Sequence, residues 1–447
     1  MLRVHARWIV PITSSPIAEG VVAVDGGLIA YVGSAAGAPA GDDLDLGDAI
    51  LLPGLVNAHT HLELTAMRGL LEDLDFPAWI RTLIAARRAV LSPDDLLDSA
   101  RMGIDEGLRA GITTYADTSE SGVTLQAMRE AGVRGVMYQE VFGPDPAGAA
   151  AALSGLRDRV DALRASESAL ARLGVSPHAP YSVSDALFID VASYALRDRL
   201  PVAIHIAESR AETELLRDAS GPFAEMLRAR AIEVRPRASS PISLLARLGV
   251  LAARPLLIHC VQADLPDLRL ISASGCGVAH CPASNAKLGH GVAPIAELLR
   301  MRVAVGLGSD SMASNNRMHL LEEARLALLF QRARTARADV PTAASALEMA
   351  TLGGARALGL SDRIGSLEIG KDADLAAFPL DAAAGTPVVD PAEAAIFALN
   401  GARASFVTVA GEVLVRDGMR ARADARVAHR VHAAAVRLAA WRHEAGA

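Results

Sequence analysis

Two histidines separated by a single residue close a short apolar run near the start of the chain. The run is "PGLVNAHTH", and it ends in His59 and His61. Successive side chains of a strand point to opposite faces, so both imidazoles would project to the same side and converge on one point. Zinc and similar ions take neutral imidazole nitrogen as a ligand. On its own, this spacing also fits ordinary polar residues at the end of a strand.

Two later apolar runs also close on a polar residue. His205 lies in "VAIHIAES" and Asp310 in "VGLGSDS". Taken singly, His205 could be a core histidine bonded to a backbone carbonyl, and Asp310 could cap the following helix. Combined with the first pair, they supply three imidazoles and one carboxylate, which suits a single divalent metal with a position left for water. Zinc is the first choice, and Fe2+ or Mn2+ would accept the same ligands.

The strands and helices that must position these residues are predicted in the middle of the chain, residues 55–365. Short apolar runs alternate there with longer segments of helical composition, a pattern typical of βα units. We count eight such runs: "LVNAHTH", "ITTYADT", "RGVMYQEV", "LGVSPHAP", "PVAIHIAES", "PLLIHCV", "CGVAHCP" and "VAVGLGSD". Their polar residues cluster at the C-terminal ends, where a (β/α)8 barrel carries its chemistry. We therefore predict an α/β fold with a TIM barrel.

Both ends of the chain contain short β-like runs, such as "GVVAVDGGLIAYVG" early and "ASFVTVAGEVLVRDG" late. A Gly-Gly turn between apolar segments favours an antiparallel sheet. We predict a small β-sandwich-like satellite domain composed of residues 1–54 and 366–420. Residues 421–447 are predicted to form an exposed C-terminal helix whose histidines carry no chemistry.

Composition narrows the class of partner. The chain of 447 residues has 44 basic and 51 acidic residues, and no run of like charge suggests a nucleic-acid arm or a membrane patch. Its three cysteines form no CxxC pair, and their odd number argues against a disulfide framework. We see neither a signal peptide nor a long apolar span. We expect a cytoplasmic protein that acts on a small molecule, and a homodimer is the default assembly.

The motifs, taken in order, resemble the amidohydrolase superfamily. They are "PGLVNAHTHLEL", "SPHAPYSVS", "HIAES", "IHCVQAD", "HCPASNAKLGHGVAP", "GLGSDSMASNN" and, from the late β-like region, "IGSLEIGKDADL". The similarity covers nearly the whole chain and is greatest to the aminohydrolase branch, with its adenosine-type and chlorotriazine hydrolases. The resemblance implies a metal-dependent TIM barrel that deaminates a heterocyclic substrate.

Carried over to matching positions, the resemblance implies that the metal is bound by the same four ligands: His59, His61, His205 and Asp310. It makes Glu208 and His259 the residues that handle protons, and His178 a substrate contact. His280 and Asn285 would lie at the rim of the pocket, although His280 could instead make a structural hydrogen bond.

The implied reaction is hydrolytic deamination. A divalent ion lowers the pKa of bound water and so makes a nucleophile available at neutral pH. Attack on the amino-bearing carbon requires a proton at the neighbouring ring nitrogen, and Glu208, three residues beyond His205, is placed to give it. Asp310 and His259 would orient the water, and ammonia leaves after a further proton transfer.

Lysine content separates two subclasses of the superfamily. Members with two metals usually bridge them with a carboxylated lysine at the end of the fourth strand. In this chain that strand ends in His178, and the only lysines, Lys287 and Lys371, lie elsewhere. We therefore expect one metal.

The choice of substrate depends on the segment after the first motif. It begins like the methylthioadenosine and S-adenosylhomocysteine deaminases, which carry a ribose-binding carboxylate shortly after a tryptophan segment. Here the corresponding place, about nine residues beyond Trp79, holds Arg87 and Arg88. The "HLELT" and "ESRAETELLRDASGPFAEML" stretches look more like aminodeoxyfutalosine deaminases.

Aminodeoxyfutalosine joins an adenine nucleoside to a carboxyphenyl group, and a guanidinium pairs well with a carboxylate. Arg87, Arg88 or Arg210 could supply it, or each could lie on a solvated helix face. Glu63, two residues after His61, either faces the pocket or has a structural role.

The leading hypothesis is thus a deaminase of a 6-aminopurine nucleoside. Aminodeoxyfutalosine is the first choice, followed by methylthioadenosine, S-adenosylhomocysteine and adenosine. The alternatives are an s-triazine, guanine or pterin aminohydrolase and, in another class, a non-catalytic barrel scaffold. A decayed scaffold should lack part of the site, but all six metal and catalytic residues are present.

Overall fold

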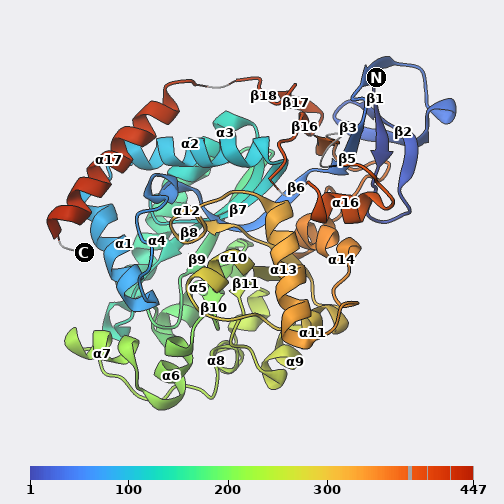
Figure 1. The fold of residues 1–447 in the computed structure, drawn as a ribbon. Helices are drawn as coiled ribbons and strands as arrows, with labels where there is room; N and C mark the ends of the chain where they lie inside the picture. The colour runs from blue at the N-terminus through green and yellow to red at the C-terminus, as the bar shows by residue number, and fades with distance from the viewer. Residues whose placement is uncertain (381–384, 400, 423, 446–447) are drawn as a thin grey trace.

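The computed structural model describes residues 1–380, 385–399, 401–422 and 424–445. Strands from the two ends of the chain lie together at the upper right of Figure 1, beside a set of parallel strands surrounded by helices. Within the described residues, no helix is both long and apolar enough to cross a membrane.

The terminal strands pair into one sheet of nine, in the order β18-β17-β16-β15-β5-β1-β2-β3 with β4 on β1. The strands are β1 (Leu2–Ile9), β2 (Ile17–Asp25), β3 (Leu28–Ser34), β4 (Asp42–Asp45), β5 (Ala49–Pro53), β15 (Leu375–Pro379), β16 (Phe406–Val409), β17 (Glu412–Arg416) and β18 (Met419–Arg420). Gly26 and Gly27 turn the chain between β2 and β3, both with positive φ, as glycine allows.

Antiparallel pairing of β5 with β15 joins the early and late strands. The sheet has a hydrophobic cluster of its own, which includes Val4, Leu51 and Phe406. The expected union of both chain ends in one sheet is therefore present. The strands are hydrogen-bonded as one continuous sheet, whereas we expected a sandwich-like pair.

All eight apolar runs predicted as barrel strands form strands. They are β6 (Leu55–His61), β7 (Ile112–Ser119), β8 (Arg134–Val141), β9 (Ala171–Pro177), β10 (Ala203–Ile206), β11 (Leu256–His259), β12 (Val278–His280) and β13 (Val305–Leu307). A short strand, β14 (Asp310–Ser311), follows β13 and pairs with β6. Every pairing among these strands is parallel. Their C-terminal ends therefore lie on the same side.

Helices follow the barrel strands and surround them (Figure 1). They are α1 (Phe76–Val90), α2 (Pro93–Arg109), α3 (Val123–Ala131), α4 (Ala149–Leu163), α5 (Asp185–Asp198), α6 (Arg210–Asp218), α7 (Pro222–Ala229), α8 (Pro241–Arg247), α9 (Leu265–Ser274), α10 (Pro282–Lys287), α11 (Ile295–Arg300), α12 (Met312–Asn315), α13 (Leu320–Thr335), α14 (Ala343–Glu348), α15 (Gly354–Ala357) and, near the terminal sheet, α16 (Pro391–Phe397). Several begin at a capping serine; Ser92 and Asp95, for example, form a reciprocal capping box at α2.

A buried arginine joins the barrel to the late part of the chain. Arg134, the first residue of β8, is only 2% exposed. Its guanidinium donates to both oxygens of Asp374 at 2.9 and 3.1 Å and to Asp372 at 2.8 Å. Both aspartates lie within three residues of the start of β15, so this ion-paired group fixes the terminal sheet against the barrel.

The last helix, α17 (Val427–Ala445), starts later and is less exposed than predicted. It packs against α1 and α2, at the upper left of Figure 1. Val431, Ala434 and Leu438 are buried in a cluster that also contains Trp79 of α1. An apolar stripe on one side of the helix explains the difference. Residues 423, 446 and 447 of the predicted segment lie outside the described residues.

Candidate functional site

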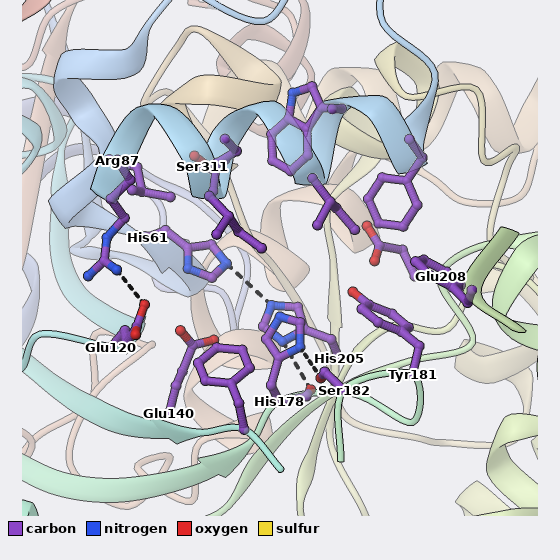
Figure 2. Close-up of a pocket in the computed structure, with 18 of the residues that line it drawn as sticks. His61, Arg87, Glu120, Glu140, His178, Tyr181, Ser182, His205, Glu208 and Ser311 are labelled. Atoms are coloured by element: carbon purple, nitrogen blue, oxygen red, sulfur yellow. Dashed lines mark hydrogen bonds and ion pairs between the residues drawn. The ribbon is translucent and has the colours of Figure 1, made fainter. Parts of the chain in front are cut away.

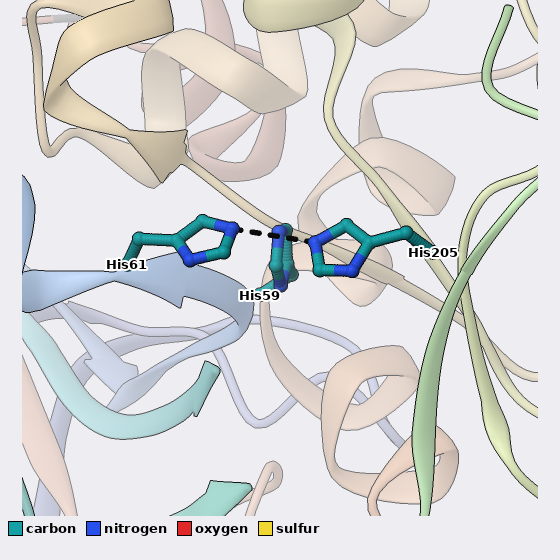
Figure 3. Close-up of side chains that lie close together, drawn as sticks. All are labelled: His59, His61 and His205. Atoms are coloured by element: carbon teal, nitrogen blue, oxygen red, sulfur yellow. Dashed lines mark hydrogen bonds between the residues drawn. The ribbon is translucent and has the colours of Figure 1, made fainter. Parts of the chain in front are cut away.

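Three imidazoles and a carboxylate meet at the C-terminal ends of the barrel strands. Figure 3 shows His61 and His205 pointing toward each other, with His59 between them. The Nε2 atoms of His61 and His205 are 3.3 Å apart, and Oδ1 of Asp310 lies 3.2 Å from Nε2 of His59 and 3.7 Å from Nε2 of His61. A tetrahedral ion with bonds of about 2.0–2.1 Å holds its ligand atoms about 3.3 Å apart. The predicted ligands therefore have the spacing of a metal site.

A hydrogen bond on the far side of the His205 ring identifies the nitrogen that would bind the ion. Nδ1 of His205 is 3.3 Å from the carbonyl oxygen of His178, whereas Oγ1 of Thr118 is 3.1 Å from Nδ1 and 3.3 Å from Nε2 of His61. A carbonyl oxygen can only accept, so Nδ1 of His205 carries the hydrogen and its Nε2 carries a lone pair. If His61 likewise donates to Thr118, two lone pairs face each other, and a cation is the group that stabilises them.

Burial keeps these rings neutral, as metal ligands must be. It lowers the pKa of His59 to about 4, and it lowers the pKa of His61 and His205 below the usual value as well. The charges of the neighbouring rings oppose protonation further. The cluster is thus a His-rich metal-binding site that needs no change of protonation to accept an ion.

Asp310 is held by several donors while it faces the histidines. Ser284 and Ser314 donate to Oδ2 at 2.5 and 3.2 Å, and the N–H of Ser311 donates to Oδ1 at 2.7 Å. The backbone of Asp310 has a φ of +56°, in the left-handed region, and His259 has a φ of +76°. Non-glycine residues in this region cost of order 1–3 kcal/mol and concentrate at functional sites.

His259 is oriented by an amide and approaches the second carboxylate. Oδ1 of Asn285 accepts from Nδ1 of His259 at 2.9 Å, which leaves Nε2 of this ring free to take a proton. That Nε2 lies 3.5 Å from Oε1 of Glu208, and Nε2 of His290 lies 3.4 Å from the same oxygen. Burial opposes ionisation of Glu208, but the two histidines outweigh it and lower the pKa of its carboxyl.

The backbone that carries Glu208 is fixed by another glutamate. The carboxylate of Glu212 accepts from the N–H groups of Ala207 and Glu208 at 3.0 and 2.9 Å. Glu212 is fully buried at the start of α6, where Ser209 is the N-cap. This arrangement turns the chain after β10 so that Glu208 enters the cavity.

The metal cluster opens into a cavity of about 690 Å³ with two unlike ends. Figure 2 shows Glu208 and Tyr181 on one side of the histidines, and Arg87, Glu120 and Glu140 on the other. The Glu208 side has aromatic walls: the rings of Tyr181 and Phe223 stack with centroids 4.1 Å apart, and Phe76 meets Phe223 edge to face. Flat apolar walls beside a carboxylate that can carry a proton suit a heteroaromatic ring.

The predicted substrate residues divide into three groups. His178, Glu63, Arg87 and Arg88 line the cavity. His280 and Asn285 are buried behind it, and Arg210 is exposed at the first residue of α6 and does not line it. His280 makes no hydrogen bond through either ring nitrogen to another described residue, contrary to the structural alternative considered for it.

Glu63 and Arg87 are already paired with each other. Nη2 of Arg87 donates to Glu63 at 2.9 Å, and Nη1 is ion-paired with Glu120. Glu63 also accepts from Ser119 at 2.6 Å and from Ser121. Arg88, in contrast, is exposed at the mouth, where no hydrogen bond or ion pair to another described residue engages its side chain.

Sequence reasoning missed several residues of the site. His290 lies in the quoted motif "GHGVAP", and Glu212 in "ESRAETELL", but neither position ends a strand. Arg230, beyond α7, lines the mouth of the cavity. Glu140 stands next to last in β8, so a search of strand ends for polar residues would have found it.

Comparison with known proteins agrees with this geometry. Residues 50–414 match the model of the amidohydrolase family. A 5-methylthioadenosine/S-adenosylhomocysteine deaminase of Moorella thermoacetica is 34% identical over 92% of this chain and 93% of its own length.

Two solved structures show the same fold. An adenosine deaminase from Xanthomonas campestris with bound zinc is 30% identical, covers 98% of both chains and has a TM-score of 0.86. An aminofutalosine deaminase of Helicobacter pylori, 20% identical, covers 93% of this chain and all of its own, and with a TM-score of 0.80 it supports the fold alone. The fold is thus that of a TIM barrel, as predicted. The chain belongs to the amidohydrolase family and is a hydrolytic enzyme that acts on C–N bonds.

Proposed function

We propose that the protein releases ammonia from a 6-aminopurine nucleoside, with one zinc ion bound by His59, His61, His205 and Asp310. The observation that carries this proposal is the convergence, at one end of an aromatic-walled cavity, of four metal ligands with Glu208 and His259. The bound ion would polarise a water so that it can act as a nucleophile. The zinc-bound relative and the deaminase names of other relatives support the choice of metal and of reaction.

His259 would take a proton from the attacking water, and Asp310 would orient that water. Nε2 of His259 has no hydrogen when Asn285 accepts from Nδ1, so this nitrogen can serve as a base. Oδ1 of Asp310, beside His59, can accept a second hydrogen bond and orient the water. Each group is buried, which strengthens these interactions relative to water.

Glu208 would give a proton to the ring nitrogen next to the amino-bearing carbon. The lowered pKa keeps this carboxyl ionised at rest, so it would first take up the proton of the attacking water from His259, which lies 3.5 Å away, and then pass it to the ring nitrogen. Transfer of a second proton from the former water to the amino group makes ammonia the leaving group, and cleavage of the exocyclic C–N bond leaves the C=O bond of the oxo product. Tyr181 and Phe223 provide the flat surface for the purine.

One ion, rather than two, is the expected content. A neighbouring group of potential ligands, Glu140, His178 and His205, has His205 in common with the metal cluster. Both ring nitrogens of His205 are already used: Nδ1 faces the His178 carbonyl, and Nε2 faces the metal cluster. No lysine lies among the cavity residues to bridge a second ion. We infer a mononuclear site.

The candidate nucleosides differ in what they require of the cavity. The curated relatives favour methylthioadenosine, S-adenosylhomocysteine or adenosine. Aminodeoxyfutalosine needs a cation for its carboxylate, and since Arg87 is paired with two glutamates, Arg88 and Arg230 at the mouth would have to supply it.

We further propose that residues 1–54 and 366–420 fold as one satellite unit beside the barrel.

An ammonia-release screen tests the proposed function. Purified protein with measured metal content would be assayed with adenosine, methylthioadenosine, S-adenosylhomocysteine, aminodeoxyfutalosine, guanine, a pterin and an s-triazine. We expect release from at least one adenine nucleoside. Release only from guanine, the pterin or the triazine would contradict the substrate class, and no release by the zinc-loaded protein would favour the scaffold alternative.

A further inference from the structure

A buried carboxyl without a partner lies at the polar end of the cavity. Glu140 is 6% exposed and lines the cavity wall. Its Oε1 is buried without a hydrogen bond, and no hydrogen bond or ion pair within the described residues engages either side-chain oxygen. Glu63 and Glu120, its neighbours at this end, are both paired with Arg87. Glu140 is therefore the carboxyl that the protein leaves available.

The surroundings make this unpaired state unfavourable. Burial raises the pKa of Glu140 well above its usual range, and the charges of Glu63 and Glu120 add to the effect more than Arg87 offsets it. A buried polar group without a hydrogen-bond partner is destabilising by about 1–3 kcal/mol, and more if it is charged. A cavity wall that retains such a group offers a position for a ligand that supplies the missing hydrogen bonds.

Charge limits what that ligand can be. Glu63 and Glu120 already pair with the guanidinium of Arg87, and Arg88 lies exposed at the mouth, so an anionic group held by Glu140 is disfavoured. A second metal is disfavoured because His205 has no ring nitrogen left to bind it. A neutral hydroxylated group remains, since a protonated carboxyl group accepts hydrogen bonds from hydroxyls and donates one to a hydroxyl oxygen.

The position of Glu140 relative to the reacting end fits a hydroxylated substituent on the substrate. In Figure 2, Glu140 lies across the histidine cluster from Glu208. A purine placed with its amino edge at Glu208 would direct the opposite edge toward Glu140. That opposite edge of a nucleoside carries the sugar.

We propose that Glu140 binds the sugar hydroxyl groups of the nucleoside and so sets the enzyme's preference for a hydroxylated substrate. This inference rests on the proposed function and assigns the sugar contact to β8. The position after Trp79, where related enzymes carry a carboxylate, holds Arg87 and Arg88 in this chain.

The test compares an adenine nucleoside identified by the ammonia screen with its 2′,3′-dideoxy analogue. We expect the wild type to prefer the hydroxylated nucleoside, and Glu140→Ala to reduce that preference in kcat/KM by about 2- to 10-fold, the value of a hydrogen bond between neutral groups. Most of the change should fall on KM for the hydroxylated substrate. Glu140→Gln, which keeps the shape and one acceptor, should lie between the two.

Two further measurements separate a substrate contact from a structural role. Because Glu140 has no protein partner to lose, both variants should retain the metal and melt at or above the wild-type temperature. Glu120→Gln alters charge in the same pocket but leaves Glu140 in place, so it should change the rates for both substrates by the same factor.

The outcomes are distinguishable. If no adenine nucleoside is deaminated by the wild type, the proposed function is wrong and this inference falls with it. If nucleosides are deaminated but Glu140→Ala keeps the full preference for the hydroxylated substrate, the inference alone is wrong. A variant that loses metal or melts at a lower temperature would assign Glu140 a structural role instead.

Discussion

Replacement of Arg134 by methionine should destabilise the protein while leaving its catalytic rate intact. The guanidinium is buried and serves Asp372 and Asp374, so the variant keeps two aspartates near a space that no longer holds their cation. Asp372 retains Arg363, and Asp374 retains the N–H of Ala410. Loss of one partner from a buried ion pair costs about 3–5 kcal/mol.

The expected shift in melting temperature follows from the length of the chain. An unfolding entropy of about 2.1 cal/mol/K per residue, over 447 residues, gives about 0.9 kcal/mol/K, so the melting temperature should fall by about 3–5 °C. Glu140 is six residues along β8 from Arg134, about 20 Å at the rise of a strand. We therefore expect kcat/KM at 25 °C to stay within about twofold of wild type.

Differential scanning calorimetry of the metal-loaded protein measures the shift, and Arg164→Met is the matched control. Arg164 is 42% exposed and paired with Asp161, so its loss should change stability by less than about 1 kcal/mol. If Arg134→Met melts within 1 °C of Arg164→Met, the buried group does not fix the terminal sheet to the barrel. Substituting Asp372 and Asp374 by Asn in the Arg134→Met background should recover part of the loss, because the unpaired charges are removed.

Further predictions concern the site. Glu208→Gln should keep its metal, as measured by elemental analysis, and its kcat should fall by about 10²–10⁴-fold. The exposed control Glu233→Gln should match the wild type. Equal rates in both variants would show that Glu208 takes no part in the mechanism. Dialysis against a chelator should abolish ammonia release, and zinc should restore it at one ion per chain; restoration that requires two ions would refute the mononuclear site. Burial lowers the pKa of His280 to about 3 in the folded protein, below the value of 6.5 expected when unfolded, so its contribution to stability is full above pH 6.5 and is lost as pH falls. When the pH is lowered from 7.5 to 5.5, the wild type should therefore lose about 1.4 kcal/mol in free energy of unfolding that His280→Gln does not lose, as measured by urea denaturation. A difference between the two proteins that does not change with pH would show that His280 takes up protons in the folded state.

The sequence was most informative where a polar residue interrupts a buried pattern. His59, His205 and Asp310 could be recognised because each follows apolar residues that only a strand interior explains, and the structure brings them together. Glu140 also interrupts an apolar run, "RGVMYQEV", near its end, but it is neither an imidazole nor part of a family motif and so was not predicted. Strand periodicity gives the face of a side chain directly, since it alternates at every residue.

Residues on helices and loops were harder to place. Arg87 and Arg88 are adjacent, yet the turn of α1 sends one to Glu63 and Glu120 and leaves the other at the mouth. Arg210 is exposed at the first residue of α6 and does not line the cavity. Such outcomes depend on helix rotation and on partners far apart in the chain, which a single sequence does not specify. The buried side of α17 was missed because its apolar stripe is narrow.

The packing of α17 on α1 has a consequence for the shape of the substrate pocket. Trp79 and Leu83 of α1 line the cavity, and Trp79 packs in the same cluster as Val431 and Leu438 of α17. One wall of the substrate pocket thus receives its support from a helix that lies far from it in the sequence. Substitutions on the buried side of α17 should therefore alter substrate selectivity although they touch none of the metal ligands.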